Sequence, residues 1–191
     1  MKQLAPLIAL ALLSGCSLLG SKTPPQLLTL TASAPLAADT QRTASAGNTL
    51  TVLVPSAAAA VAGTRVPVYD GGIAVAYVKD AVWVDAPARQ LQRLLGETIA
   101  ARSERVVLDP RQSTVDPGTR VSGSLVRFGI DAATNEAVVT FDAQLVRDAG
   151  SVVTRRFEAR APIAAIDALN AATSLNQAAN AVAVQVADWV R

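Results

Sequence analysis

Histidine is absent from the 191-residue chain, and lysine is found only at Lys2, Lys22 and Lys79. The absence of histidine excludes histidine-based catalytic triads and removes the commonest general base near neutral pH. It also removes the side chain on which most zinc and iron sites depend. The chain contains no GxSxG, P-loop or GxGxxG motif. We therefore expect no enzyme, no metal and no cofactor, and a hydrolase that uses carboxylates alone is a distant alternative.

Cysteine and surplus positive charge are also scarce. Cys16 is the single cysteine, so the chain cannot form a disulfide framework of its own. The 17 Lys and Arg residues are nearly balanced by 15 Asp and Glu residues. This balance provides no basic field of the kind that nucleic-acid-binding domains carry, so no nucleic-acid partner is expected.

The stretch Leu13-Ser14-Gly15-Cys16 follows a short apolar run and has the form of a lipobox. Lys2 supplies a charged region before residues 4–13, which are too few to span a bilayer because a spanning helix needs about 20 apolar residues. Residues 1–15 are therefore predicted to be a signal peptide, and Cys16 is the predicted site of lipid attachment. The alternative is an ordinary secretory signal with an unmodified thiol. Because serine rather than aspartate follows Cys16, we expect an outer-membrane anchor with the domain facing the periplasm.

The remainder of the chain is long enough for one domain with a sizeable core. Residues 16–25 are predicted to be the lipidated N-terminus and a tether that ends in two prolines, and residues 26–191 a single domain. Residues 26–31 have the composition of a short first strand. Residues 32–48 lack any hydrophobic period and are predicted to be a flexible loop, for which simple disorder is as good an interpretation as a binding role.

The first half of the domain shows strand patterns followed by a helix. Three strands are predicted, at residues 49–55, 64–70 and 73–78. Gly71-Gly72 favours a hairpin between the last two. Residues 56–63 are too rich in alanine to strengthen a sheet and too short to form a helix alone. Asp85 is the predicted N-cap of a helix that ends near residue 103, with Gln90 on its solvent-exposed face.

The second half predicts a meander and a final helix. Residues 119–131, 137–147 and 152–161 alternate in polarity and follow a short strand at 105–108. Residues 171–190 carry a narrow apolar stripe suited to docking on a sheet. The pattern predicts an α+β fold, a two-layer sandwich in which two main helices pack on one face of a largely antiparallel sheet.

The run AYVKDAVWVDAP from Ala76 to Pro87 is followed by Gln90-Leu91 and Leu94-Leu95, and the chain closes with ADWV at 187–190. Together with the lipobox, these motifs resemble the ABC-type transport auxiliary lipoproteins, the family that includes the lipoprotein of the Pqi system. The signature positions are Tyr77, Trp83, Pro87, Leu91 and Trp189.

The resemblance implies a lipoprotein that works with an Mce-type ABC transporter, which moves phospholipids or other apolar molecules between the two membranes. Its partners would be the Mce-domain substrate-binding protein, the permease and the ATPase of that system. The family has no catalytic residues to carry over. Tyr77 and Trp83 either line a lipid or partner groove or, as we favour, staple the helix to the sheet.

Arg155, Arg156 and Arg160 are predicted to form one basic strand face. The interpretation that we favour is a solvated face whose edge charges discourage aggregation. The alternative is a face that meets acidic lipid or an Mce partner. The leading hypothesis for the whole chain is an adaptor, with homo-oligomerisation to match a ring-shaped partner. A periplasmic lipid carrier and an outer-membrane assembly factor are the alternatives, and a carrier would need an apolar pocket.

Overall fold

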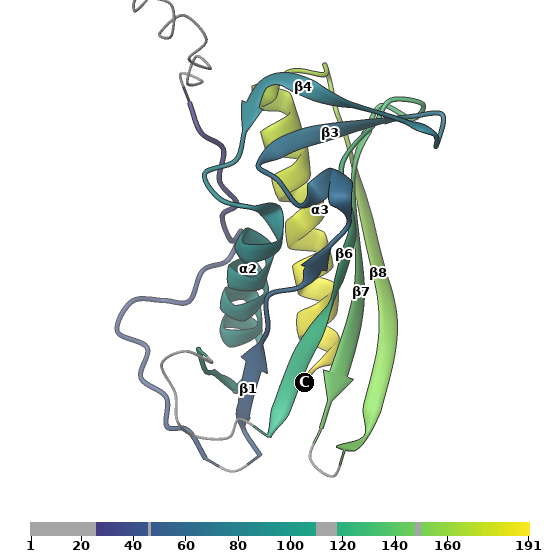
Figure 1. Ribbon diagram of the computed structural model, residues 1–191. Coiled ribbons are helices and arrows are strands. Elements are labelled where there is room, and N and C mark those ends of the chain that lie inside the picture. Colours follow the sequence, from purple (N-terminus) through teal and green to yellow (C-terminus); the bar gives the residue numbers. More distant parts are fainter. Residues whose placement is uncertain (1–25, 46, 110–117, 148–149) are drawn as a thin grey trace, which may run out of the picture.

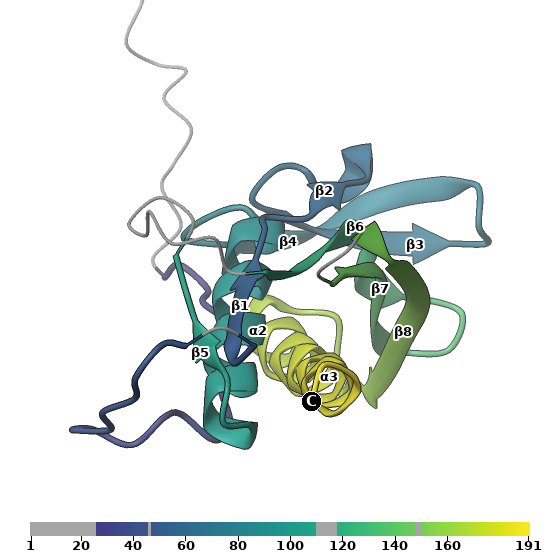
Figure 2. The ribbon, with the colours of Figure 1, turned by 90° about the horizontal axis from the view of Figure 1, so that it is seen from below.

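The computed structural model describes residues 26–45, 47–109, 118–147 and 150–191 (Figure 1). The predicted signal peptide, Cys16 and the tether lie outside these residues. Within the described residues, all strands join one eight-stranded sheet. Helices α2 (Pro87–Arg102) and α3 (Ala168–Trp189) lie together on the concave side of this sheet (Figure 2). The predicted two-layer α+β architecture is therefore confirmed.

Strand β6 (Thr119–Asp131) is the centre of the sheet. On one edge it pairs antiparallel with β7 (Glu136–Val146), which pairs antiparallel with β8 (Val152–Pro162). These three strands confirm the predicted meander. Eleven paired positions between β7 and β8 run without a register shift, which keeps one face of both strands toward the helices along their whole length.

The other edge of β6 takes three short strands in succession, all parallel to it. They are β1 (Thr49–Val52), β2 (Ser56–Ala57) and β3 (Arg65–Asp70), and β5 (Val106–Val107) pairs parallel with β1. The sheet is therefore mixed on this side. Residues 56–63 were not expected to strengthen a sheet, and that prediction is wrong. β2 and the 3₁₀ helix η1 (Ala59–Val61) form there because the free edge of β6 supplies hydrogen-bond partners for the backbone.

The predicted hairpin at Gly71-Gly72 is confirmed between β3 and β4 (Ala74–Val82). Both glycines have positive φ, 57° and 77°, a conformation that glycine adopts without steric cost. β4 extends past the predicted end at Val78. Residues 26–31 form only an isolated parallel bridge, between Leu28 and Trp83, so the predicted first strand is reduced to one pairing.

The helices begin close to the predicted positions. Ala86, not Asp85, is the N-cap of α2, and the Asp85 carboxylate accepts a hydrogen bond from the Ala86 N–H instead. The α3 N-cap is Asp167, which accepts from the Asn170 N–H at 2.9 Å. The predicted stripe of α3 is buried at Leu175, Ala179, Val182 and Val186. No helix in the described part of the chain has the length and apolarity needed to cross a membrane.

Gln90 is fully buried on α2, although its position on the polar side of the sequence pattern predicted exposure. Its Oε1 accepts a hydrogen bond from the Leu30 N–H at 2.9 Å, and its Nε2 donates to the Asp85 carbonyl at 2.8 Å. The amide therefore links the first described segment to the start of the helix. A buried polar side chain is stable here because both ends have partners.

Replacement of Gln90 by methionine should lower the free energy of unfolding by about 1–3 kcal/mol, because the buried Leu30 N–H then loses its acceptor. Arg93→Met on the exposed side of the same helix is the control, and it should change the value by less than about 0.5 kcal/mol. Urea denaturation of both variants checks this. Equal effects of the two substitutions would contradict the role of Gln90.

Gly123 lies where β6 and β7 approach each other closely. A Cβ built at this position would overlap the Asp142 carbonyl oxygen and come within 2.8 Å of the Phe141 ring, and φ is +154°. A Cβ built in the same way at Gly63, in the loop before β3, has no atom within 4 Å. Position 123 therefore requires glycine, whereas position 63 has space for a methyl group.

We expect Gly123→Ala to destabilise the protein by at least about 2 kcal/mol, since the methyl group can be placed only by moving β6 away from β7. Gly63→Ala should stay within about 0.5 kcal/mol of the parent. Thermal and urea unfolding of the pair provide the comparison. A stable Gly123→Ala variant would show that the two strands can separate at little cost.

Candidate functional site

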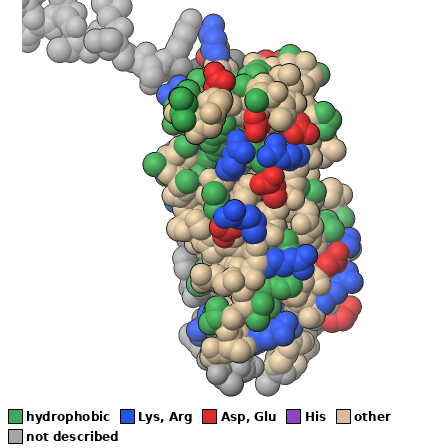
Figure 3. All heavy atoms as spheres, turned by 90° about the vertical axis from the view of Figure 1, so that its right-hand side faces the viewer, with side chains coloured by type: hydrophobic (Ala, Val, Ile, Leu, Met, Phe, Trp, Pro, Cys, Tyr) green, Lys and Arg blue, Asp and Glu red, His purple; other side chains and the backbone are tan. Residues whose placement is uncertain are grey.

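The outer face of the meander is polar because side chains alternate along each strand. On β7, Phe141, Ala143 and Leu145 are buried toward the helices, while Asp142 and Gln144 point outward. Figure 3 shows acidic and basic side chains interspersed over the face of the molecule on the β8 side. The sheet thus separates a packed face from a hydrated one.

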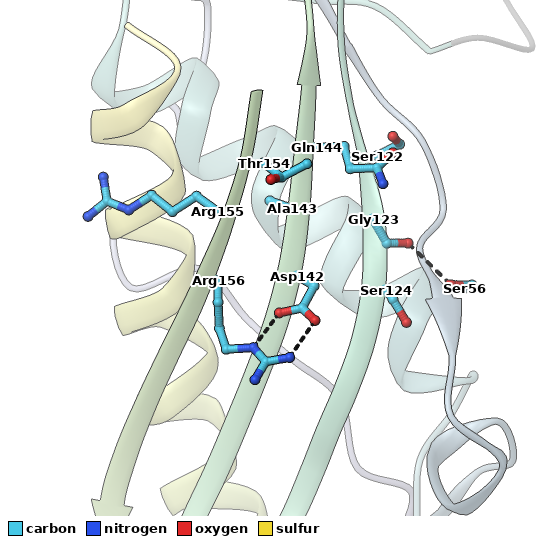
Figure 4. Close-up of a pocket in the computed structure, with 10 residues that line it drawn as sticks. All are labelled: Ser56, Ser122, Gly123, Ser124, Asp142, Ala143, Gln144, Thr154, Arg155 and Arg156. Carbon is cyan, nitrogen blue, oxygen red and sulfur yellow. Dashed lines mark hydrogen bonds and ion pairs between the residues drawn. The ribbon is translucent and has the colours of Figure 1, made fainter. Parts of the chain in front are cut away.

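A hollow of about 710 Å³ lies on this outer face (Figure 4). Its outward side chains come from β2, β6, β7 and β8: Ser56, Ser122, Ser124, Asp142, Gln144, Thr154 and Arg156. The small residues of β6 leave space between β2 and the longer side chains of β7 and β8. Ser56 Oγ donates to the Gly123 carbonyl at 3.4 Å, which ties β2 to the rim.

Arg156 and Asp142 form a two-bonded ion pair on one wall of the hollow (Figure 4). Arg156 Nε lies 2.6 Å from Asp142 Oδ1, and Nη2 lies 2.7 Å from Oδ2. The hydrogen bonds from Arg156 lower the pKa of the Asp142 carboxyl below its ordinary value, and Asp142 raises the pKa of Arg156. The two side chains are 64% and 39% exposed, so the pair adds little stability but holds both groups in place.

A second charged cluster lies further along the same face. Arg160 contacts Glu158, Glu136 and Asp131 at 3.0, 3.3 and 3.5 Å. Thr140 Oγ1 donates to Glu158 at 2.8 Å, and this hydrogen bond is the main reason that the pKa of Glu158 is lowered. Acidic groups therefore neutralise the arginines of this face locally.

The prediction that Arg155, Arg156 and Arg160 share one basic face is wrong. Arg156 and Arg160 point outward, but Arg155 is one residue out of step and lies over the Phe157 ring, 5.0 Å from its centroid, on the other side of the strand. The period of two in a β-strand makes this unavoidable. The involvement of these arginines with a partner or lipid stays a prediction.

The family-signature positions lie away from the hollow. Trp83 is buried and packs edge-to-face on Phe128 at 5.5 Å, and Leu91 is fully buried. Pro87 is the first residue of α2. Trp189 packs on Phe157 at 5.4 Å, whereas Tyr77 is 36% exposed and lies under the Arg65 guanidinium at 3.9 Å.

Of the residues that line the hollow, the sequence predictions named Arg155 and Arg156 as site residues but not the others. The signal that could have found them is the alternation of polar and apolar residues along β7 and β8. The pairing register of the two strands is also needed to tell which outward residues lie opposite each other. A two-residue turn at Ala149-Gly150 would pair Ala143 with Arg156, but the structure pairs Asp142 with Arg156. That difference of one residue exchanges the faces of the strand.

The hollow is lined by groups that form hydrogen bonds. Its lining supplies hydroxyl groups, an amide and one paired carboxylate, but no lysine beside a serine that would activate a nucleophile. Among the residues that the structure describes, no three acidic or cysteine side chains are grouped so that they could hold a metal ion. The arrangement is suited to binding a polar surface.

Comparisons with known proteins give consistent results. Residues 28–187 match the family model described as "ABC-type transport auxiliary lipoprotein component". The fold is similar to the crystal structure of a Xanthomonas campestris protein of family DUF330, with a TM-score of 0.72 and 18% identity over 86% of this chain and 94% of that chain. A second crystal structure, of an uncharacterized protein, gives a TM-score of 0.67 and 14% identity over 87% and 100% of the two chains. No match to this chain is found among curated proteins.

Acid should weaken the outer face of the meander. The folded-state pKa values of Asp142 and Glu158 are lowered, so their contribution to stability is present above the unfolded-state pKa of about 4 and is lost as the pH falls through the folded-state values. In the parent, the free energy of unfolding should fall below about pH 5, and we expect this fall to be smaller in the double variant Asp142→Asn with Glu158→Gln. The difference should be less than about 1 kcal/mol per site, because both carboxylates belong to surface pairs. An unchanged slope in the double variant would contradict the assignment.

Proposed function

Because the chain belongs to the family of ABC-type transport auxiliary lipoprotein components, we propose that it is the membrane-anchored adaptor of an Mce-type ABC transport system. Membership supports a transport-associated role in the cell envelope, and the family is not one of enzymes. The finer proposal is that the adaptor supports lipid or apolar-solute traffic between the inner and outer membranes. Its partners are then the Mce-domain substrate-binding protein, the permease and the ATPase.

The proposed anchor is Cys16, acylated after removal of residues 1–15, with the domain on the periplasmic side of the outer membrane. One acyl chain gives marginal membrane binding, whereas two or more hold a protein stably. A lipoprotein cysteine that carries a diacylglyceryl group therefore keeps the adaptor at the membrane throughout its working life.

The observation that favours an adaptor over a lipid carrier is the filled space between sheet and helices. Trp83, Phe128, Phe141 and Phe157 from the sheet are at most 1% exposed, and they pack with Leu91, Leu95, Leu175 and Val182 from the helices. A carrier needs an apolar cavity of several hundred cubic ångströms. The hollow of about 710 Å³ lies on the opposite, polar face, and two further hollows of about 460 and 540 Å³ are lined mainly by polar and charged residues.

The polar hollow is the proposed docking surface for the transporter. Its hydroxyl groups and the Arg156–Asp142 pair can exchange hydrogen bonds with polar side chains of a partner, while the ion pair keeps the local net charge near zero. Such a surface suits an interface that is assembled from two folded proteins, since most of its polar groups are already oriented.

Ser124→Arg tests this proposal by filling the hollow. In native membranes, affinity capture followed by mass spectrometry should recover the substrate-binding protein, permease and ATPase with the parent, and about tenfold less of them with Ser124→Arg, as expected when a central interface position is blocked. Ser151→Arg introduces the same charge beside β8 and should leave recovery unchanged.

Two results would reject the proposal. Equal recovery with both variants would remove the hollow from the interface. Phospholipid retained one-to-one by the purified parent, without recovery of transporter proteins, would favour the carrier instead.

A further inference from the structure

Six apolar side chains are exposed on segments that are far apart in the sequence. Ile73, in the β3–β4 turn, is 98% exposed, and Leu169, near the start of α3, is 72% exposed. The others are 43–55% exposed and come from the first described residues, β4, the β4–α2 connection and the residues before α3: Leu27, Val75, Val84 and Ile166. Single exposed apolar residues are ordinary, whereas a group gathered in one place indicates a binding surface.

The structure brings these segments to one pole. The Leu28–Trp83 bridge, with Val84 N–H donating to the Leu28 carbonyl at 2.8 Å, places residues 27 and 84 on adjoining segments. Thr31 N–H donates to the side chain of Asn176, and Ser33 N–H donates to that of Asn180. The segment therefore runs along α3 toward its C-terminus, so the residues before Thr31 lie toward the N-terminal end of the helix. Figure 1 shows that end of α3, the β3–β4 hairpin and the first described residues in the upper part of the molecule, with the turn of the hairpin on the right and the first described residues on the left.

The hairpin holds Ile73 outward in a defined way. Gly71 and Gly72 have positive φ and form a tight turn, and β3 is hydrogen-bonded to β6 as well as to β4. Ile73 therefore lies in a short turn whose first strand, β3, is hydrogen-bonded on both sides, to β4 and to β6. Solvent exposure of such a side chain has no benefit for folding.

The chain that precedes the described residues indicates what this pole faces. Cys16 is ten residues before Gln26, and an extended chain spans at most about 3.5 Å per residue, or about 35 Å in all. If Cys16 is acylated, as the proposed function requires, the chain enters the domain at this end, within about 35 Å of the bilayer surface. The hairpin from Arg65 to Val82 carries two basic residues, Arg65 and Lys79, and two acidic residues, Asp70 and Asp80. This balance favours apolar contact over attraction to anionic headgroups.

We propose that this pole, led by Ile73, is a second membrane contact that inserts into the phospholipid surface in which Cys16 is anchored. The inference rests on the proposed function for the anchor but adds an orientation to it. Strands β6, β7 and β8 run from this pole to the opposite end of the domain (Figure 1). With the pole on the bilayer, the polar hollow stands at the side of the domain, where a partner in the periplasm can reach it.

The test uses the mature, acylated protein in phosphatidylcholine vesicles. Because acylation consumes the thiol of Cys16, Ile73→Cys provides a unique site for an environment-sensitive fluorophore, and spin-labelled phosphatidylcholine then serves as the quencher. Val152→Cys is the control, since Val152 is also an exposed apolar residue, 57% exposed, but lies at the start of β8 near the opposite pole. Leu169→Cys provides a second position at the proposed contact.

We expect the lipid quencher to remove most of the fluorescence at positions 73 and 169 and to leave position 152 unaffected, with no increase when anionic lipid is added. Acylation of the N-terminal peptide is checked by mass spectrometry. If the peptide is acylated, equal quenching at positions 73 and 152, or no quenching at position 73, would overturn the inference. An unacylated N-terminus would overturn both the anchor and the contact. Acylation without quenching at 73 therefore separates failure of this inference from failure of the proposed function.

Discussion

Strand β6 imposes the constraint on which the rest of the structure depends, because both of its edges are occupied along most of its length. β7 lies along one edge, and β1, β2 and β3 lie end to end along the other. The close approach at Gly123 and at Gly129, where a Cβ would overlap the Pro67 carbonyl oxygen, shows how tightly the neighbours are held. A side chain at either glycine would separate β6 from its neighbours, and the core beneath depends on their spacing.

The same arrangement explains the division of roles between the two faces. Toward the helices, the aromatic residues Trp83, Phe128, Phe141 and Phe157 fill the space under the sheet. Outward, the small residues Ser122 and Ser124 leave the hollow, and paired charges such as Arg156 and Asp142 border it. Exposed ion pairs add little to stability, so this face can serve binding without a large effect on the fold.

Several features of the fold were predictable because they depend on local pattern. The meander follows from alternation, the hairpin from Gly71-Gly72, and the α3 stripe from its helical spacing. Predictions failed where a distant segment supplied the partner. Gln90 is buried because Leu30 and Asp85 bind both ends of its amide, and Ser56-Ala57 is a strand because β6 has a free edge there. The grouping of Arg155 with Arg156 failed for a different reason, since the period of two within a single strand already places them on opposite faces.

The sequence by itself determined the class of fold, the absence of histidine chemistry and the family signature, since each of these depends on residue types and short-range spacing. Only the tertiary structure decided which polar residues share the hollow, which arginines are neutralised, and which exposed apolar side chains gather at one pole. These properties arise from contacts between residues separated by fourteen positions, as for Asp142 and Arg156, or by many more, as for Leu28 and Trp83. A pattern of short period carries no information on such pairs, because their geometry is set by strand register and by the packing of helices on the sheet.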